Sequence, residues 1–276
     1  MKNSLIIFFL SIVFLSTCKS QTTEPKKVEI PTPEGYQLVW NDEFDYNGLP
    51  DPQKWGYDVG GHGWGNQELQ YYTDKRLDNA KVENGKLVIT AKMENYQGMS
   101  FTSARLVTKN RGDWTYGRIE VRAKLPYGKG TWPAIWMLPT QWNLGNGGWP
   151  DNGEIDIMEH VGYDPGWIHA STHCNKYVHT KGTQKTAKIY INDAMTQFHN
   201  YILEWNKDEI KMYVDDKHYF TSYNEGKGWE YWPFFKDFHL ILNIAVGGSW
   251  GGAQGIDTSI FPQKMEVEYV RVFKKL

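Results

Sequence analysis

The sequence predicts an all-β protein folded as an antiparallel β-sandwich, and three observations favour that class. Short β-like runs follow one another along most of the chain. Turn residues separate these runs: the 276 residues include 27 Gly and 12 Pro, and Asn84-Gly85 is a strong tight-turn signal. No stretch shows a long helical period, and residues 186–198 are the only modest candidate for a helix. Many short strands joined by turns are typical of sandwiches.

The expected strands are distributed over the whole folded part of the chain. The first pair flanks the Asn84-Gly85 turn, and Lys207-Asp208 and Asp215-Asp216 are turn-like breaks between later strands. We expect strands, in chain order, at 81–83, 86–92, 101–109, 116–125, 132–138, within 153–162, and at 168–173, 199–205, 210–214, 238–246 and 267–273.

The composition limits the number of domains and the class of partner. The chain is 40% hydrophobic, which is enough for one sizeable core. A net charge of −2 gives no reason to expect a polyanion or a charged membrane surface as partner. The sequence has no basic stripe, Walker loop, dinucleotide fingerprint or convincing zinc spacing, so we expect no nucleic-acid partner. Its 13 Trp and 17 Tyr are unusual, because flat rings with polar edges suit sugars as well as cores.

The first 18 residues have the features of a bacterial lipoprotein signal peptide. Lys2 supplies the positive end, and the apolar run 5–15 is too short to span a bilayer as a stable helix. Leu15-Ser16-Thr17-Cys18 resembles a lipobox, which predicts lipidation of Cys18. The expected location is then the cell envelope or outer-membrane surface, with a lipid anchor as the only membrane contact. An ordinary signal peptide on a secreted protein is the alternative.

The remaining chain divides into a tether and one domain. Residues 19–34 are rich in Ser, Thr, Pro, Glu and Lys and have little to bury, so we expect a flexible tether. Residues 35–276 are expected to form a single folded domain. Cys174 follows an expected strand and is interpreted as a small buried residue rather than a nucleophile.

Residues 153–162 hold three carboxylates within six positions. Glu154 and Asp156 alternate with apolar residues and therefore share one face of a strand, with Ile155 on the other. Glu159 is five positions from Glu154, so a regular strand would place it on the opposite face. One bulged residue near Ile157 or Met158 would bring all three acids onto one floor, and bulges are common beside active sites. Clustered carboxylates that raise one another's pKa mark active sites.

This stretch resembles the active-site strand of glycoside hydrolase family 16. The matching residues are Glu-Ile-Asp-Ile-Met-Glu, preceded by Trp149-Pro150 and followed by His160-Val161-Gly162. The strand resembles most the laminarinase (endo-β-1,3-glucanase) branch of the family, which carries the extra Met. The resemblance extends from the opening strand at 36–44 to Phe273. It implies a β-jelly roll with a substrate cleft across its concave sheet.

The resemblance also implies roles for the three acids. Glu154 would be the nucleophile and Glu159 the acid/base of a retaining double displacement. Asp156, between them, is expected to hydrogen-bond Glu154 and to keep Glu159 protonated by its nearby charge.

Several further residues are expected to bind the sugar chain. Asn66 in a Gly-rich loop matches a family contact, with a turn-forming Asn as the alternative. Arg105 matches a second motif and needs an acidic or hydroxylated partner, with a surface salt bridge as the alternative. Trp132 and Trp136 share a strand face, and the resemblance implies that they form walls of the cleft. The alternative is a pair of Trp residues packed in the core.

Two more candidates complete the expected cleft. Trp250 lies among glycines, where stacking on a ligand is the better interpretation than packing in a strand interior. His173 follows the acidic strand and is within possible reach of the carboxylates, with a satisfied core His as the alternative.

The family resemblance further implies a structural Ca²⁺ on the side away from the cleft. Its ligands would be Glu43, the Gly85 carbonyl and Glu268, since oxygen ligands suit this ion. The family usually has Asp where this chain has Glu268, so the extra methylene changes the geometry. No cofactor is expected for catalysis.

The predicted function is therefore an endo-acting, retaining glycoside hydrolase that cleaves β-1,3-glucosidic bonds in laminarin-type β-glucan, acting as a monomer. Three alternatives stay open. The first two are relatives that cut mixed-linkage β-1,3-1,4-glucan or a marine galactan. The third is a non-catalytic carbohydrate-binding protein on the same fold, which would be expected to have lost one or more of the acids.

Overall fold

The computed structural model describes residues 29–276. The chain divides between Pro31 and Thr32, and the fold described below is that of the unit Thr32–Leu276. The predicted signal peptide, with Cys18, and most of the predicted tether lie outside the described residues. Among the described residues, no helix is long and apolar enough to cross a membrane.

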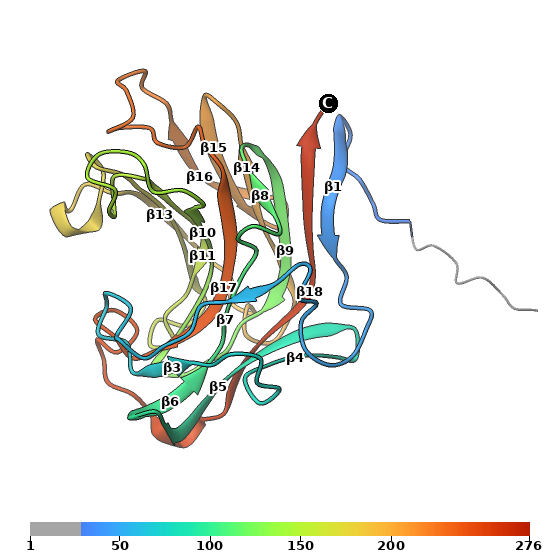
Figure 1. Cartoon of the computed structure of the whole chain (residues 1–276), viewed down its shortest axis with the longest axis vertical. Helices are drawn as coiled ribbons and strands as arrows, with labels where there is room; N and C mark the ends of the chain where they lie inside the picture. The colour runs from blue at the N-terminus through green and yellow to red at the C-terminus, as the bar shows by residue number, and fades with distance from the viewer. Residues whose placement is uncertain (1–28) are drawn as a thin grey trace, which may run out of the picture. The chain divides into compact units, whose positions relative to one another are not determined.

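Two sheets make up the fold (Figure 1). The larger has ten strands. Its main path runs β16 (Lys217–Tyr223), β15 (Glu209–Val214), β14 (His199–Trp205), β9 (Gly117–Lys124), β18 (Gln263–Lys275), β5 (Lys86–Tyr96), β6 (Met99–Ser103) and β3 (Gln70–Tyr72). β1 (Tyr36–Asp42) pairs with β18, and β4 (Ala80–Glu83) pairs with β5.

The second sheet has eight strands and is called the cleft sheet below. Its path runs β13 (Lys185–Tyr190), β12 (Trp167–His173), β11 (Glu154–Glu159), β10 (Thr131–Pro139), β17 (Phe238–Val246), β7 (Arg105–Val107) and β2 (Gly56–Tyr57), with β8 (Asp113–Trp114) on β17. Two short 3₁₀ turns, His179–Lys181 and Thr258–Ile260, are the helical pieces of the described chain. The predicted antiparallel sandwich is confirmed, and the β3–β6 pair is parallel.

The core lies between the two sheets, and strand alternation decides which residues enter it. In β11 the side chains of Ile155, Ile157 and Met158 are fully buried, while Glu154 and Glu159 at its ends stay partly open. β17 is buried along its whole length, and on its cleft side Asn243 bonds Trp136 of β10 and Tyr72 of β3. In Figure 1 strands β10, β11 and β13 curve around an open side that faces away from β9 and β18. The apolar side of β11 therefore holds the sheets together, and its acidic side faces the opening.

Three sequence expectations differ from the structure. The run 101–109 is two strands, because the chain passes from the larger sheet (β6) to the cleft sheet (β7) at Ala104; both are buried, so the apolar pattern is continuous across the break. The helical candidate 186–198 is wrong: it holds most of β13, an edge strand whose exposed residues alternate with period two. The strand β16 and several two- or three-residue strands are not among the expected elements.

Candidate active site

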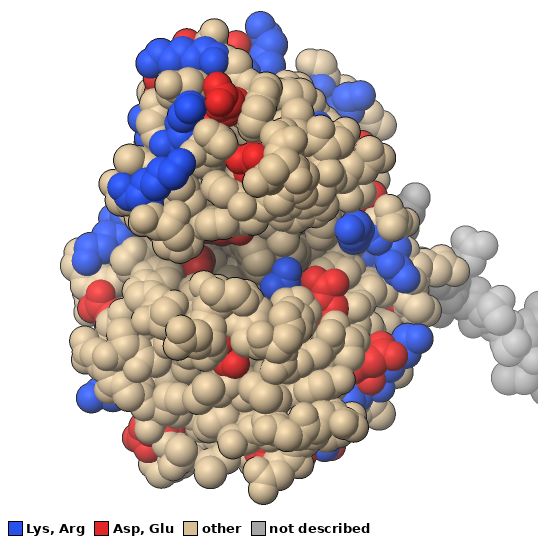
Figure 2. Space-filling model, turned by 60° about the vertical axis from the view of Figure 1, so that its left-hand side comes forward, with Lys and Arg blue, Asp and Glu red and all other residues tan. Residues whose placement is uncertain are grey.

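A cavity of about 780 Å³ lies on the open face of the cleft sheet. Figure 2 shows that face hollowed, with acidic side chains visible inside the hollow. Its lining includes every catalytic and sugar-binding residue predicted from the sequence: Asn66, Arg105, Trp132, Trp136, Glu154, Asp156, Glu159, His173 and Trp250. Loops far apart in the chain therefore converge on one site.

The predicted bulge in β11 is confirmed by the strand register. On β10, Ile135 pairs with Met158 and Trp136 pairs with Asp156, so Ile157 has no partner of its own. On the other side, the three acids Glu154, Asp156 and Glu159 pair with His173, Ser171 and His169. Those partners alternate along β12 and so share one face. The extra residue thus brings Glu159 onto the same floor as the other two acids.

Gly153 fixes the entry into this strand. Its φ of +88° is in the left-handed region, and a Cβ there would lie 2.9 to 3.0 Å from Pro233, Phe234 and Phe238. A side chain at this position would be both strained and in collision. Glycine therefore allows the backbone to turn tightly over buried rings immediately before Glu154.

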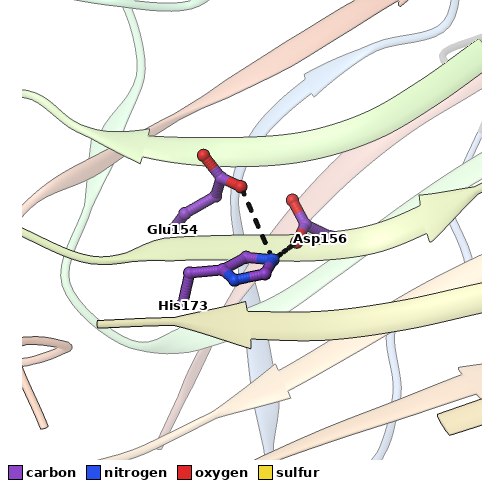
Figure 3. Close-up of side chains that lie close together, drawn as sticks. All are labelled: Glu154, Asp156 and His173. Atoms are coloured by element: carbon purple, nitrogen blue, oxygen red, sulfur yellow. Dashed lines mark ion pairs between the residues drawn. The ribbon is translucent and has the colours of Figure 1, made fainter. Parts of the chain in front are cut away.

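His173 lies between two of the acids (Figure 3). Its Nε2 is 3.2 Å from Asp156 Oδ2 and 3.8 Å from Glu154 Oε1. The three ligand-type atoms lie within 4.8 Å of one another. The predicted direct hydrogen bond from Asp156 to Glu154 is not among those of residues 29–276, and Asp156 Oδ2 has no aligned donor there. The histidine, rather than a direct contact, links these two carboxylates.

Two indole N–H groups orient the outer acids. Trp149 Nε1 donates to Glu154 Oε2 at 3.0 Å, and Trp132 Nε1 donates to Glu159 Oε1 at 3.0 Å. A donor held at one oxygen leaves the other oxygen of each carboxylate free to face a ligand. The two acids are therefore fixed in the same way but by residues from different loops and strands.

Burial raises the pKa of all three acids. Desolvation is the largest cause in each case, and it raises the pKa of Glu159 to about 8, with the charge of Asp156 adding to the effect. Burial likewise raises the pKa of Glu154 to about 8, and the Asp156 charge adds to the effect. His173 and one indole hydrogen bond lower the pKa of each outer acid, so the two acids compete for a proton on nearly equal terms. The arrangement suits one ionised and one protonated outer acid.

We expect Asp156→Asn to stabilise the fold at neutral pH while slowing catalysis. Asp156 is 2% exposed, and burial raises its pKa to about 8, well above the usual value of about 3.9 in an unfolded chain. The folded state therefore holds a proton that the unfolded state has released between about pH 4 and pH 8. Wild-type stability falls across that window, by at most about 1.4 kcal/mol for each pH unit.

The neutral amide of Asn does not titrate, so the variant does not lose this stability as the pH rises. The stability difference between variant and wild type should therefore depend on pH. The melting temperature of Asp156→Asn should exceed that of the wild type at pH 7 to 8, and the difference should vanish below about pH 4. Thermal denaturation across this range measures it. A difference that is constant with pH would mean that ionisation of Asp156 is not the cause.

Arg105 lies between two indoles at one end of the cavity. Its Cζ is 4.7 Å from the ring centroids of both Trp64 and Trp136, and its Nε donates to Asp58 Oδ2 at 3.0 Å. The guanidinium thus lies close to two indole rings and is paired at its edge. The surface salt bridge expected as the alternative for Arg105 is present, with Asp58 as the partner, and Arg105 lines the cavity as well.

The two predicted wall residues of β10 lie in the lining and not in the core. Trp136 is half-buried, and its Nε1 donates to Asn243 Oδ1 at 2.7 Å. Trp132 is also half-buried and meets Trp250 edge-on at 5.5 Å. Ala134, between them on the same face, pairs with Glu159. Two rings therefore flank a small residue beside the acid/base candidate, as expected.

Asn66 belongs to a polar network at the same end of the cavity as Arg105. Its Nδ2 donates to Glu68 Oε1 at 3.2 Å, and its backbone N–H donates to Gly63, so Asn66 makes the turn and lines the cavity at once. Glu68 also accepts from Gln70 and Tyr72. The Asn66 side chain is consequently held in place before any ligand arrives.

Several lining residues were missed by the sequence analysis. Trp149, which holds Glu154, was expected only as part of the motif before the acidic strand, and Glu68 was not expected. Neither residue lies in a strand pattern, so the sequence feature that points to them is their position beside motif residues. The other missed lining residues with polar or aromatic side chains include His62, Trp64, Tyr72, Trp142, His169, His179 and Asn243.

The predicted calcium ligands are already engaged with arginines. Glu43 accepts from Arg271 Nε and Nη2 at 3.0 and 2.8 Å, and Glu268 accepts from Arg122 Nε at 2.7 Å. Each guanidinium supplies the positive charge that a calcium ion would bring, so these two carboxylates do not form a preorganised calcium site. Calcium binding stays a prediction, and it would require at least one of these ion pairs to open.

Comparisons with known proteins agree on one family. The model for glycosyl hydrolases family 16 matches residues 66–271. A "Beta-glucanase" from Rhodothermus marinus is 56% identical over 244 residues, which are 87% of this chain and 85% of that protein.

Two solved structures extend the agreement to the fold. The laminarinase from Rhodothermus marinus superposes with a TM-score of 0.87 at 56% identity, covering 87% of this chain and 98% of that one. A mutant of a non-specific endo-beta-1,3(4)-glucanase from family GH16 superposes with a TM-score of 0.84 at 47% identity, covering 89% and 97%. Together with the two-sheet topology, these likenesses confirm the predicted jelly-roll sandwich.

Proposed function

This chain belongs to glycosyl hydrolases family 16, and from that premise we propose that it is an endo-acting, retaining β-1,3-glucanase of laminarin-type glucan. One observation carries the chemistry: the bulge in β11 places Glu154, Asp156 and Glu159 on one face at the floor of the cavity. Retaining hydrolysis needs a nucleophile and an acid/base on the same site. The long, open cavity suits attack inside a polymer chain rather than at its end.

The proposed mechanism assigns each acid one role. Ionised Glu154 attacks the anomeric carbon while protonated Glu159 gives its proton to the departing glucosidic oxygen, so the sugar becomes an ester of Glu154. Glu159, now ionised, takes a proton from water, and the resulting hydroxide displaces Glu154 from the anomeric carbon. His173, whose Nε2 lies 3.8 Å from Glu154 and 3.2 Å from Asp156, helps to position the nucleophile.

The structure also bears on the rival substrates. Within the described residues, the cavity lining holds one Arg and no Lys, and that Arg105 lies close to two indole rings and is paired with Asp58. A sulfated galactan would need free cations in the cleft, so this arrangement disfavours it. Mixed-linkage glucan is the second candidate, because one similar structure is that of a non-specific endo-beta-1,3(4)-glucanase. A binding protein needs none of the three acids, and all three are present.

The proposal is tested on purified polysaccharides. Laminarin, mixed-linkage glucan and a sulfated galactan are incubated with the enzyme, and products are sized while proton NMR follows the first anomer released. We expect short β-1,3-linked oligosaccharides from laminarin, first released as the β-anomer. Binding of laminarin without release would make the protein a sugar-binding relative. Initial release of the α-anomer would exclude the covalent mechanism.

We also propose that the domain is held at the cell envelope by lipid on Cys18. The support is the short apolar run 5–15 followed by Leu-Ser-Thr-Cys. One acyl signal alone gives weak anchoring, whereas the several chains of a bacterial lipoprotein hold a protein firmly.

Cys18→Ala tests the anchor. We expect the wild type to partition into the detergent phase and the variant to be unprocessed or to partition into the aqueous phase. The matched control is Cys174→Ala, which removes the buried thiol and should leave partitioning unchanged. Wild-type protein found in the aqueous phase would overturn the proposal and favour a secreted protein.

A further inference from the structure

Beyond the cavity, the cleft sheet carries a second group of aromatic residues at its edge. β13 is the last strand of the sheet, and its Ala187 and Ile189 pack on the core. Thr186, Lys188 and Tyr190 therefore face the other way, on the side of the cleft. Thr186 lines the cavity, whereas Lys188 and Tyr190 lie outside it. The open face of the sheet thus continues past the cavity.

The neighbouring strand adds a second ring on this face. On β12, His169, Ser171 and His173 line the cavity, and Trp167 lies two residues beyond His169 on the same face. Trp167 pairs with Tyr190 across the strands, and their ring centroids are 5.3 Å apart. Lys188 Nζ is 4.2 Å from the Trp167 ring centroid. We call Trp167, Lys188 and Tyr190 the edge platform.

Tyr190 is exposed and yet supported by its neighbours. Its side chain is 55% exposed, although an aromatic ring of this size usually finds a place to bury. A Cβ added to Gly166 would lie 2.8 Å from Tyr190 Cε2, so the ring rests directly against the backbone of that glycine. One side of the ring is thus supported by main chain, and more than half of the side chain stays open to a ligand. A supported flat ring loses little conformational freedom when it binds.

The edge platform is connected to the catalytic floor by contacts. His169, which pairs with Glu159, meets Trp250 of the cavity edge-on at 5.1 Å. On its other side His169 pairs with Lys188, which lies over Trp167. Since His169 and Trp250 line the cavity and Lys188 and Trp167 lie next to His169, a chain that extends past His169 reaches this platform.

We propose that the edge platform is an additional subsite, which binds sugar residues of the same β-glucan chain after it leaves the cavity on the β13 side. Tyr190 supplies the stacking face, and Trp167 and Lys188 supply an apolar edge and a hydrogen-bond donor for sugar hydroxyls. The inference rests on the proposed function, because the ligand is the substrate itself. Its consequence is a preference for long chains over chains too short to reach β13.

The test compares kcat/KM across laminari-oligosaccharides of increasing length and laminarin. Tyr190→Ala should lower kcat/KM about fivefold for the longest substrates and leave the shortest cleaved substrate unchanged. Tyr190→Phe, which keeps the ring, should behave as wild type. The matched control is Tyr223→Ala, which removes an equally exposed Tyr (63%) from β16 of the other sheet and should change nothing.

Other results would overturn the edge platform. Unchanged kcat/KM for Tyr190→Ala at every length, or an equal loss at every length, would show that the ring binds no distal sugar. A change in oligomeric state by gel filtration without a length-dependent loss would make this face a contact between copies of the chain.

Failure of the proposed function is recognised separately. In that case the wild-type protein cleaves no β-1,3-glucan. The edge platform is then tested by electrophoresis in native gels that each contain one soluble polysaccharide. The polymer that binds should retard Tyr190→Ala less than the wild type. Equal retardation of the two proteins, or none in any gel, rejects it.

Discussion

Glu154→Ala is expected to lower kcat for laminarin by at least about 10⁴-fold, because the residue that forms the covalent intermediate is gone. Trp149 and His173, which hold the Glu154 carboxylate in the wild type, remain in place around the space it leaves. Azide fits such a space and needs no base to attack. With an aryl β-glycoside that has a good leaving group, azide should restore turnover and give a glycosyl azide of inverted configuration.

The fold of this variant is checked independently of its activity. Removal of a buried carboxylate whose pKa is raised should leave the melting temperature at neutral pH unchanged or higher. The matched control is Glu230→Ala, which removes a carboxylate with 43% of its side chain exposed and should keep full activity. An azide product of retained configuration from Glu154→Ala would exchange the proposed roles of the two outer acids.

The acidic strand shows how far local pattern determines this site. The five-residue spacing of Glu154 and Glu159 is visible in the sequence, and it requires a bulge once both acids are placed on one face. The structure contains that bulge at Ile157. Strand alternation likewise places Trp132 and Trp136 on the cleft side. These features depend on the two-residue period of a strand, which the sequence carries directly.

Contacts between distant loops were not predictable in the same way. Trp149 reaches Glu154 from the loop after β10, and Trp64 reaches Arg105 from the loop after β2, and no periodic pattern records either meeting. Asp156 was expected to bond Glu154 because the two are neighbours on one face, but His173 from the next strand lies between them. Side-chain partners across strands depend on register, which the whole sheet sets. The prediction of a helix at 186–198 was wrong for a related reason, since pairing with β12 makes the first part of this segment a strand.

Glu159→Ala is expected to separate the two chemical steps, since Glu159 acts as acid in the first and as base in the second. For laminarin the departing oxygen needs a proton, so kcat/KM should fall about 10² to 10⁴-fold. An aryl leaving group needs none, so its release should stay fast while hydrolysis of the intermediate is slow. Azide should then accelerate turnover and give a product of retained configuration.

The pH profile provides a second measurement of the same role. Burial is the largest cause that raises the pKa of Glu159 to about 8, so this acid keeps its proton through neutral pH. Wild-type kcat/KM for laminarin should therefore fall as the pH rises through about 8, because the ionised form has no proton to give. With the aryl substrate, Glu159→Ala should lose this fall at high pH. If the fall persisted in Glu159→Ala with unchanged midpoint, another group would be the acid, and Glu159 would hold only a structural place beside Trp132.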